Sequence, residues 1–182
     1  DTNFINDNAR DIRSTRVSNR TAFRLDNGWK LEAGGYINDK SLYHPIFQVI
    51  DQNSVDLGAF TRLNGDNFVI GANIGRGMND AKRFVNNGGK RGVRTAYADQ
   101  LAENIELYGE HTYKFLPDWS LITGLQGSFN NREYEDHLNN ANNDDKTYTS
   151  LNPKIGVMWN FDPASEIYAS LTRSSEAPTF SE

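Results

Sequence analysis

The stretch Ile155–Ser174, IGVMWNFDPASEIYASLTRS, alternates apolar residues with small or polar ones on both sides of Asp162-Pro163-Ala164-Ser165. Alternation with a period of two is typical of β-strands, and Asp-Pro suits a tight turn, so the stretch predicts a β-hairpin. Two large aromatic residues, Trp159 and Phe161, precede the turn on the apolar face of the first strand. That placement is unexpected in a water-soluble sheet, so the other hairpins of the chain decide how to interpret it.

Three further turn signals occur at Asp26-Asn27-Gly28, Asn64-Gly65-Asp66 and Leu116-Pro117-Asp118. Asn-Gly tolerates the positive φ of tight hairpins, and Pro-Asp suits a type I turn. Each signal is flanked by alternating runs of about ten residues, the length of a membrane-spanning strand. The chain therefore predicts eight strands in four hairpins, with turns near Asn27, Gly65, Pro117 and Pro163.

Aromatic residues accompany all four turns: Phe23, Trp29, Phe68, Phe115, Trp119, Trp159 and Phe161. An aromatic belt at one level, an apolar band beyond it and a polar opposite face are typical of the wall of an outer-membrane β-barrel. The alternative is a soluble antiparallel protein with one buried face. Its aromatic residues would be spread through the core, and its two loop ends need not differ.

The remaining connections are long and polar: Asn38–Ser54, Gly77–Gln100 and Asn131–Thr149. Bacterial barrels have short periplasmic turns and longer extracellular loops. The expected fold is therefore all-β, an antiparallel up-and-down wall of a transmembrane β-barrel, with eight strands and long loops at one end only.

The composition limits the alternatives. Of 182 residues, 37% are hydrophobic and 24% charged, with a mean hydropathy of −0.70, and no window approaches the run of about 18 apolar residues that a membrane helix needs. A β-barrel remains possible because half of each strand faces a polar lumen. The net charge of −5 argues against nucleic-acid binding. The absence of cysteine excludes disulfides and cysteine-ligated metals.

The C-terminal stretch Ser150–Glu182, SLNPKIGVMWNFDPASEIYASLTRSSEAPTFSE, resembles a segment of the barrel of TonB-dependent outer-membrane receptors. Ile105–Asp136 is similar to another hairpin of that family, except that His111 replaces an expected acidic or amide residue. The residues that carry the resemblance are Asn152, Pro153, Lys154, Ile155 and Gly156, then Tyr168, Ala169, Ser170, Arg173, Pro178, Phe180 and Glu182.

The resemblance implies a 22-stranded barrel of the bacterial outer membrane, filled by a plug and energised by the TonB complex. Residues 1–182 would then be an internal part of the barrel domain, without the plug and the remaining strands. The implied function is active import of a scarce ligand, such as a ferric siderophore or another iron chelate. A passive porin or a structural barrel without energy coupling is the alternative.

Arginine binds carboxylate and chelate oxygens through paired hydrogen bonds, and tyrosine offers a stacking surface. Such residues at the outer rim and in the long connections would suit an anionic ferric chelate, although polar lumen walls carry charges in any case. The candidate ligand-binding residues are Arg16, Tyr43, His44, Arg83, Arg91 and Arg94.

No constellation of residues predicts catalysis, so the chain is not expected to be an enzyme, and no resident cofactor is expected. Glu133–His137 (EYEDH) groups acids with a histidine, and a cation site is conceivable there, but a solvated loop is the favoured interpretation. Asn139–Asp145 lacks the glycine and the terminal glutamate of an EF-hand. No metal site is therefore predicted.

Overall fold

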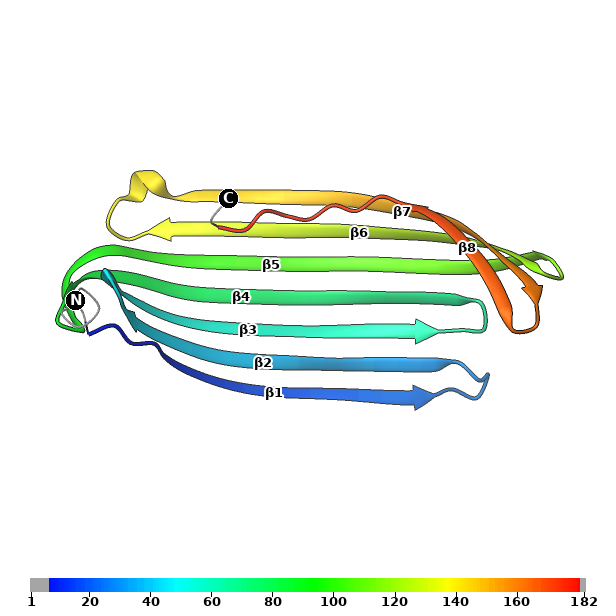
Figure 1. Cartoon of the computed structure of the whole chain (residues 1–182), viewed down its shortest axis with the longest axis horizontal. Helices are drawn as coiled ribbons and strands as arrows, with labels where there is room; N and C mark the ends of the chain where they lie inside the picture. The colour runs from blue at the N-terminus through cyan, green and yellow to red at the C-terminus, as the bar shows by residue number, and fades with distance from the viewer. Residues whose placement is uncertain (1–6, 181–182) are drawn as a thin grey trace.

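A computed structural model describes residues 7–180 as one antiparallel sheet of eight strands, in which every strand pairs with the next along the chain (Figure 1). Among these residues, no helix is long and apolar enough to cross a membrane. Within residues 7–180 there is one 3-10 turn, η1, at Asn140–Asn142. The strands are β1 (Asp11–Arg24), β2 (Lys30–Pro45), β3 (Gln48–Asn64), β4 (Phe68–Asn87), β5 (Lys90–Leu116), β6 (Trp119–Asp136), β7 (Asp144–Asp162) and β8 (Ser165–Thr172).

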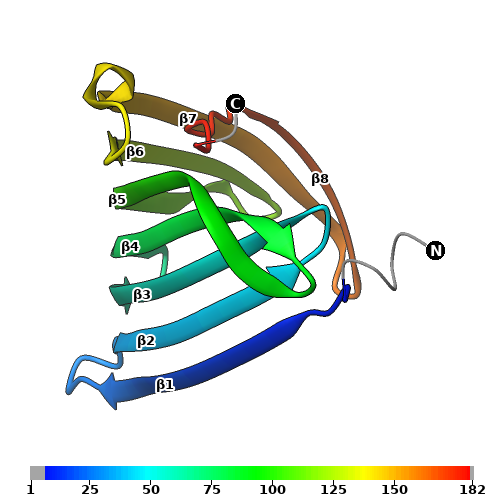
Figure 2. The same cartoon turned by 90° about the vertical axis from the view of Figure 1, so that its left-hand side faces the viewer.

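The sheet is a single curved layer that does not close (Figure 2). Strands β1 and β8 each pair with one neighbour within the described residues, so each leaves one edge of backbone groups outside the ladder. The predicted all-β, up-and-down arrangement of eight strands is confirmed.

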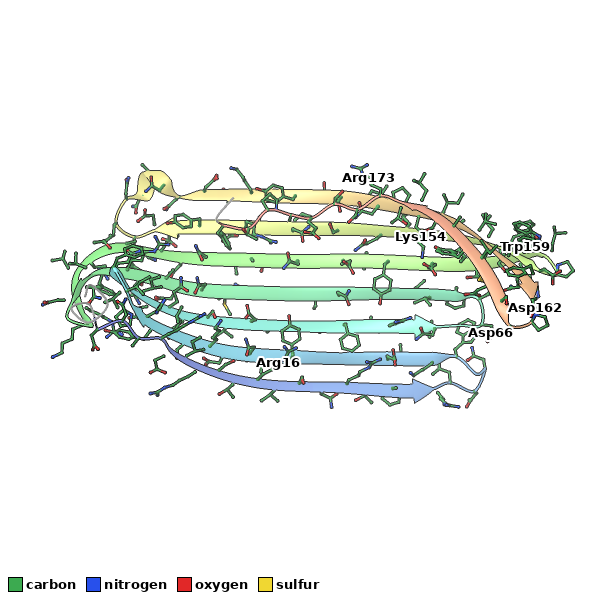
Figure 3. All side chains as sticks on the ribbon, viewed as in Figure 1. Arg16, Asp66, Lys154, Trp159, Asp162 and Arg173 are labelled. Carbon is green, nitrogen blue, oxygen red and sulfur yellow. The ribbon has the colours of Figure 1, made fainter. Side chains whose placement is uncertain are left out.

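One end of the sheet, the turn end, holds the four short connections predicted from the sequence. They comprise residues 25–29, 65–67, 117–118 and 163–164. Gly28 has a φ of +85°, which explains the need for glycine in the first of these turns. The aromatic residues gather here: Trp29 and Phe68 meet edge to face at 4.9 Å, and Figure 3 places Trp159 beside the last turn.

The opposite end, the tip end, differs from the sequence prediction. Of the expected long loop Asn38–Ser54 only residues 46–47 lie outside strands, and of Gly77–Gln100 only Gly88 and Gly89 do. Residues 137–143 form the third connection. At about 3.3 Å per residue, β5 alone is about 90 Å long. The alternation of apolar and polar residues is lost where both faces of the sheet are polar. The backbone ladder nevertheless continues there, so these polar stretches form strands although their sequence resembles that of loops.

The two faces of the sheet follow from the register of the ladder. On one face, the apolar face, Ile74 is paired with Ile105, which is paired with Phe129, and these three side chains are about half exposed. The other face, the polar face, carries charged and amide side chains. Val49, fully buried, and Ala98, 5% exposed, make up the buried hydrophobic core in the part of the chain that the structure describes. A sheet with so little core needs an apolar surrounding on one face.

At the tip end the β4–β5 connection packs against the end of the β2–β3 hairpin. The Tyr43 hydroxyl donates a hydrogen bond of 2.7 Å to the Gly89 carbonyl, and the Asn86 amide donates one to the Ile46 carbonyl. Val49 is fully buried in this region. The contact holds two neighbouring hairpins together beyond their shared ladder.

Candidate functional site

Near the turn end the polar face carries a buried acid between two cations. Glu32 is only 4% exposed, and its Oε1 lies 2.9 Å from Arg20 Nη2 and 2.7 Å from Lys30 Nζ. The pairing follows from the alternation, because all three side chains fall on the same face of β1 and β2. The two cations stabilise the buried carboxylate of Glu32, which would be costly to bury without a partner.

Further along, the polar face forms a shallow depression of about 440 Å³ that extends from β3 to the end of β8. Glu106 accepts hydrogen bonds from Asn73 and Gln126, and Lys154 Nζ lies 2.7 Å from Glu110 Oε2. Asn152 in its floor is 6% exposed, and its Oδ1 has no hydrogen-bond partner among the described residues. The depression thus offers both signs of charge and one free acceptor.

The segment after β8 lies against the same face. Arg132, on β6, donates hydrogen bonds to the carbonyls of Pro178 and Glu103. These contacts bring the end of the described chain back over the sheet toward the tip end (Figure 1). Glu182, the last residue of the family-like stretch, lies outside the described residues.

Three of the six predicted ligand-binding residues lie on the polar face. Arg16 stacks over the Tyr36 ring, 4.8 Å from its centroid, well away from the turn end (Figure 3). His44 and Arg83 are both paired with Ile50, so they occupy one row across β2, β3 and β4. The Arg83 side chain is exposed and makes no ion pair with any described residue.

The other three residues follow the apolar face into the tip region. Arg91 Nε lies 2.7 Å from Asp51 Oδ2, and its guanidinium stacks over the Tyr43 ring. Arg94 stacks over Tyr97. The structure therefore divides the predicted set between two faces, and it already engages Arg91 with a carboxylate.

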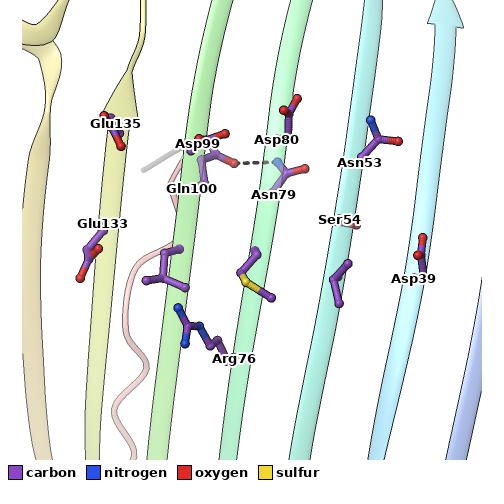
Figure 4. Close-up of a pocket in the computed structure, with 13 residues that line it drawn as sticks. Asp39, Asn53, Ser54, Arg76, Asn79, Asp80, Asp99, Gln100, Glu133 and Glu135 are labelled. Carbon is purple, nitrogen blue, oxygen red and sulfur yellow. Dashed lines mark hydrogen bonds between the residues drawn. The ribbon is translucent and has the colours of Figure 1, made fainter.

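Glu133 and Glu135 were noted in the sequence, but the rest of a second group of charged residues was missed because their stretches looked like loops. A depression of about 660 Å³ lies directly beyond the apolar band, largely on the apolar face of the strands (Figure 4). Its charged lining consists of Arg76 and five acids: Asp39, Asp80, Asp99, Glu133 and Glu135. Knowing that β2, β4, β5 and β6 continue through this region would have shown that the acids share a face.

Hydrogen bonds shift the pKa values of two groups in the tip region. The pKa of Lys82 is raised, chiefly by its hydrogen bond to Asp80. The pKa of Asp136 is lowered by the Asn142 side chain and then by the backbone N–H groups of Leu138 and Asn139, all of which donate to its carboxylate. Asp136 thereby organises the β6–β7 connection.

The chain is similar in sequence to a known protein family. Residues 1–182 match the sequence model of a family described as "TonB dependent receptor-like, beta-barrel". This is a family of receptors and transporters of the bacterial outer membrane, not of enzymes. No curated protein sequence shows a significant match.

Several solved structures share the fold, including the following three. The unliganded ferric citrate transporter FecA superposes with a TM-score of 0.74 at 13% identity, over 90% of this chain and 27% of that one. The ferric-catecholate import receptor Fiu from E. coli K12, in its open form, gives 0.74 at 11%, over 94% and 37%. The alcaligin outer-membrane receptor FauA from Bordetella pertussis gives 0.67 at 16%, over 91% and 30%. The chain thus spans about a third of the length of these proteins.

Proposed function

Because the chain belongs to the TonB-dependent receptor β-barrel family, we propose that it forms part of the wall of an outer-membrane receptor that imports a ferric siderophore or a similar iron chelate. The observation that carries the proposal is the match to this family over all 182 residues. The remaining strands, a plug and the contact with the TonB complex belong to the complete receptor, of which this chain is one segment.

The solved relatives support the choice of ligand class. FecA is a transporter of ferric citrate, Fiu imports ferric catecholates and FauA is a receptor for alcaligin. Their shared architecture with this chain favours an iron chelate over other small ligands, and active import over the passive diffusion of a porin.

The chain's own surfaces fit this role. The exposed aliphatic and aromatic side chains of the apolar face contact outer-membrane lipid, with the aromatic belt of the turn end at the periplasmic interface. The polar face lines the lumen. There, Arg16 and Arg83 present exposed guanidinium groups toward an anionic chelate, and His44 lies in the same row as Arg83. Tyr43, Arg91 and Arg94 contribute by shaping the rim.

The proposal is tested by deleting the gene for the complete receptor and measuring uptake of radiolabelled iron supplied as citrate, catecholate or hydroxamate chelates. Loss of uptake of one chelate, restored by the intact gene but not in cells lacking TonB, is the expected result. Uptake that continues without TonB would instead assign the barrel to passive diffusion. Unchanged uptake of every chelate would remove iron import from consideration.

A further inference from the structure

Three carboxylates lie directly opposite one another on the apolar face in the tip region. Asp80 on β4 is paired with Asp99 on β5, and Asp99 is paired with Glu135 on β6. Like charges in directly opposed positions destabilise a sheet. Lys82 balances Asp80 with an ion pair of 2.7 Å, which leaves Asp99 and Glu135 to be balanced by something else.

An imidazole completes this arrangement. His137 Nε2 lies 2.8 Å from Asp99 Oδ2, and His137 Nδ1 lies 3.9 Å from Glu135 Oε1. One donor atom from each of the three residues lies within 4.8 Å of the other two. The Tyr97 ring packs on the imidazole with centroids 4.3 Å apart, and the backbone N–H of His137 donates to the Tyr97 carbonyl, so the histidine is held in place.

We propose that Asp99, Glu135 and His137 bind a divalent transition-metal ion, with Zn²⁺ the best match. One imidazole and two carboxylates form a mixed nitrogen and oxygen donor set that suits Zn²⁺. Bonds of about 2.0–2.2 Å require the donor atoms to sit about 3.3–3.5 Å apart. The ion would take one ring nitrogen of His137, and the exposed side chains of Asp99 and Glu135, whose backbones stand opposite each other, would rotate toward it.

A bound metal ion would also offset the excess negative charge of this surface. The adjoining depression has five acids and one arginine, and Arg76 already lies 3.6 Å from Glu103. A dication bound by all three residues neutralises both opposed carboxylates. The ion would tie β5 to the end of β6, independently of any ligand taken up through the lumen.

The test uses the complete receptor in detergent, titrated with Co²⁺ alone as a spectroscopic probe, followed by displacement with Zn²⁺. The expected result is a set of visible d–d absorption bands that Zn²⁺ abolishes. His137→Gln and, separately, Asp99→Asn should each weaken Co²⁺ binding at least about tenfold, since even groups that only support a ligand cost this much. The heat-dependent gel mobility of each variant shows that the barrel is folded.

His111→Gln is the matched control, because His111 lies on β5 near the turn end and contacts Asn67 rather than a carboxylate. This variant should retain the full Co²⁺ signal. Bands of equal intensity in His137→Gln, or no bands in the unmodified receptor, would overturn the proposal. Neither outcome bears on iron uptake, which is measured separately.

Discussion

Trp119 and Trp159 stand directly opposite each other on β6 and β7, and their rings stack with centroids 5.2 Å apart and planes 9° from parallel. Phe161 continues the cluster at 5.4 Å from Trp159. The pair lies at the turn end, where the proposed orientation places the periplasmic interface. It links two hairpins by side-chain contact at the level where amphipathic rings are most stable in a membrane.

Replacing both tryptophans should reveal this coupling. In a double-mutant cycle of Trp119→Ala and Trp159→Ala, we expect an interaction free energy of about 0.5–1.5 kcal/mol, the usual value of an aromatic pair beyond its buried area. The measurement is urea unfolding of the complete receptor in lipid vesicles, followed by gel mobility. Trp159→Phe, which keeps a ring, should lose less than Trp159→Ala. Strictly additive single effects would show that the stacking contributes nothing.

The β4–β5 turn depends on its first glycine. Gly88 has a φ of +57°, and a Cβ built there meets nothing within 4 Å, so only the backbone conformation opposes a side chain. Gly88→Val should destabilise the turn by about 1–2 kcal/mol, whereas Gly88→Asn should cost less because asparagine tolerates this region. Hydrogen exchange of tip-end amides should quicken roughly 5–30-fold in the valine variant. Equal exchange in both variants would contradict this explanation.

Acid should loosen the β6–β7 connection selectively. The carboxylate of Asp136 has a lowered pKa in the folded protein because the Asn142 side chain and two backbone N–H groups donate to it. A lowered folded pKa gives stability that is present above the ordinary carboxyl pKa and lost as pH falls through the lowered value. Exchange of the Leu138 and Asn139 amides, corrected for intrinsic rates, should therefore rise in acid. Asp136→Asn should remove this pH dependence, and Asp118→Asn at the turn end should leave it intact.

The division of the rim arginines between two faces predicts unequal roles in ligand binding. Arg83→Ala should weaken binding of the transported chelate by about 1.5–3 kcal/mol, or about 10–150-fold, the cost of a lost charge-assisted hydrogen bond. Arg94→Ala is the control, because Arg94 follows the apolar face and stacks on Tyr97. Titration of the complete receptor with its chelate measures both. Equal losses in the two variants would show that general rim charge, not the lumen face, governs binding.

The sequence was sufficient to predict the strands near the turn end. Alternation with a period of two appears only where one face is apolar and the other polar, and that condition holds beside Trp159 and its counterparts. It fails toward the tip, where Asp39, Asp80 and Asp99 stand on the face that carries Ile74 lower down. Those strands extend by backbone pairing between residues whose types give little strand signal. Asn87-Gly88-Gly89 carries a hairpin-turn signal, since Asn-Gly and Gly-Gly favour paired positive φ values, but the sequence prediction placed these residues in a long connection.

The candidate site was harder to predict for the same reason. Arg83 and Arg91 are eight positions apart in the sequence and were assigned to one loop, yet the β4–β5 register puts them on opposite faces. Similarly, Glu135 and His137 could be grouped from the sequence, whereas Asp99 joins them only through the ladder between β5 and β6. Long-range register, not local composition, decides which side chains meet.

The extended β4–β5 hairpin also determines which surface an antibody against this region can bind. A surface made of paired strands presents epitopes assembled from neighbouring strands, because consecutive residues point to opposite faces. An antibody raised against a free peptide covering 77–100 would recognise a flexible chain. In the native hairpin, half of the side chains that such an antibody contacts point to the opposite face of the sheet and are out of its reach. Immunogens that reproduce this region must therefore carry both β4 and β5 in register, with the Gly88-Gly89 turn intact.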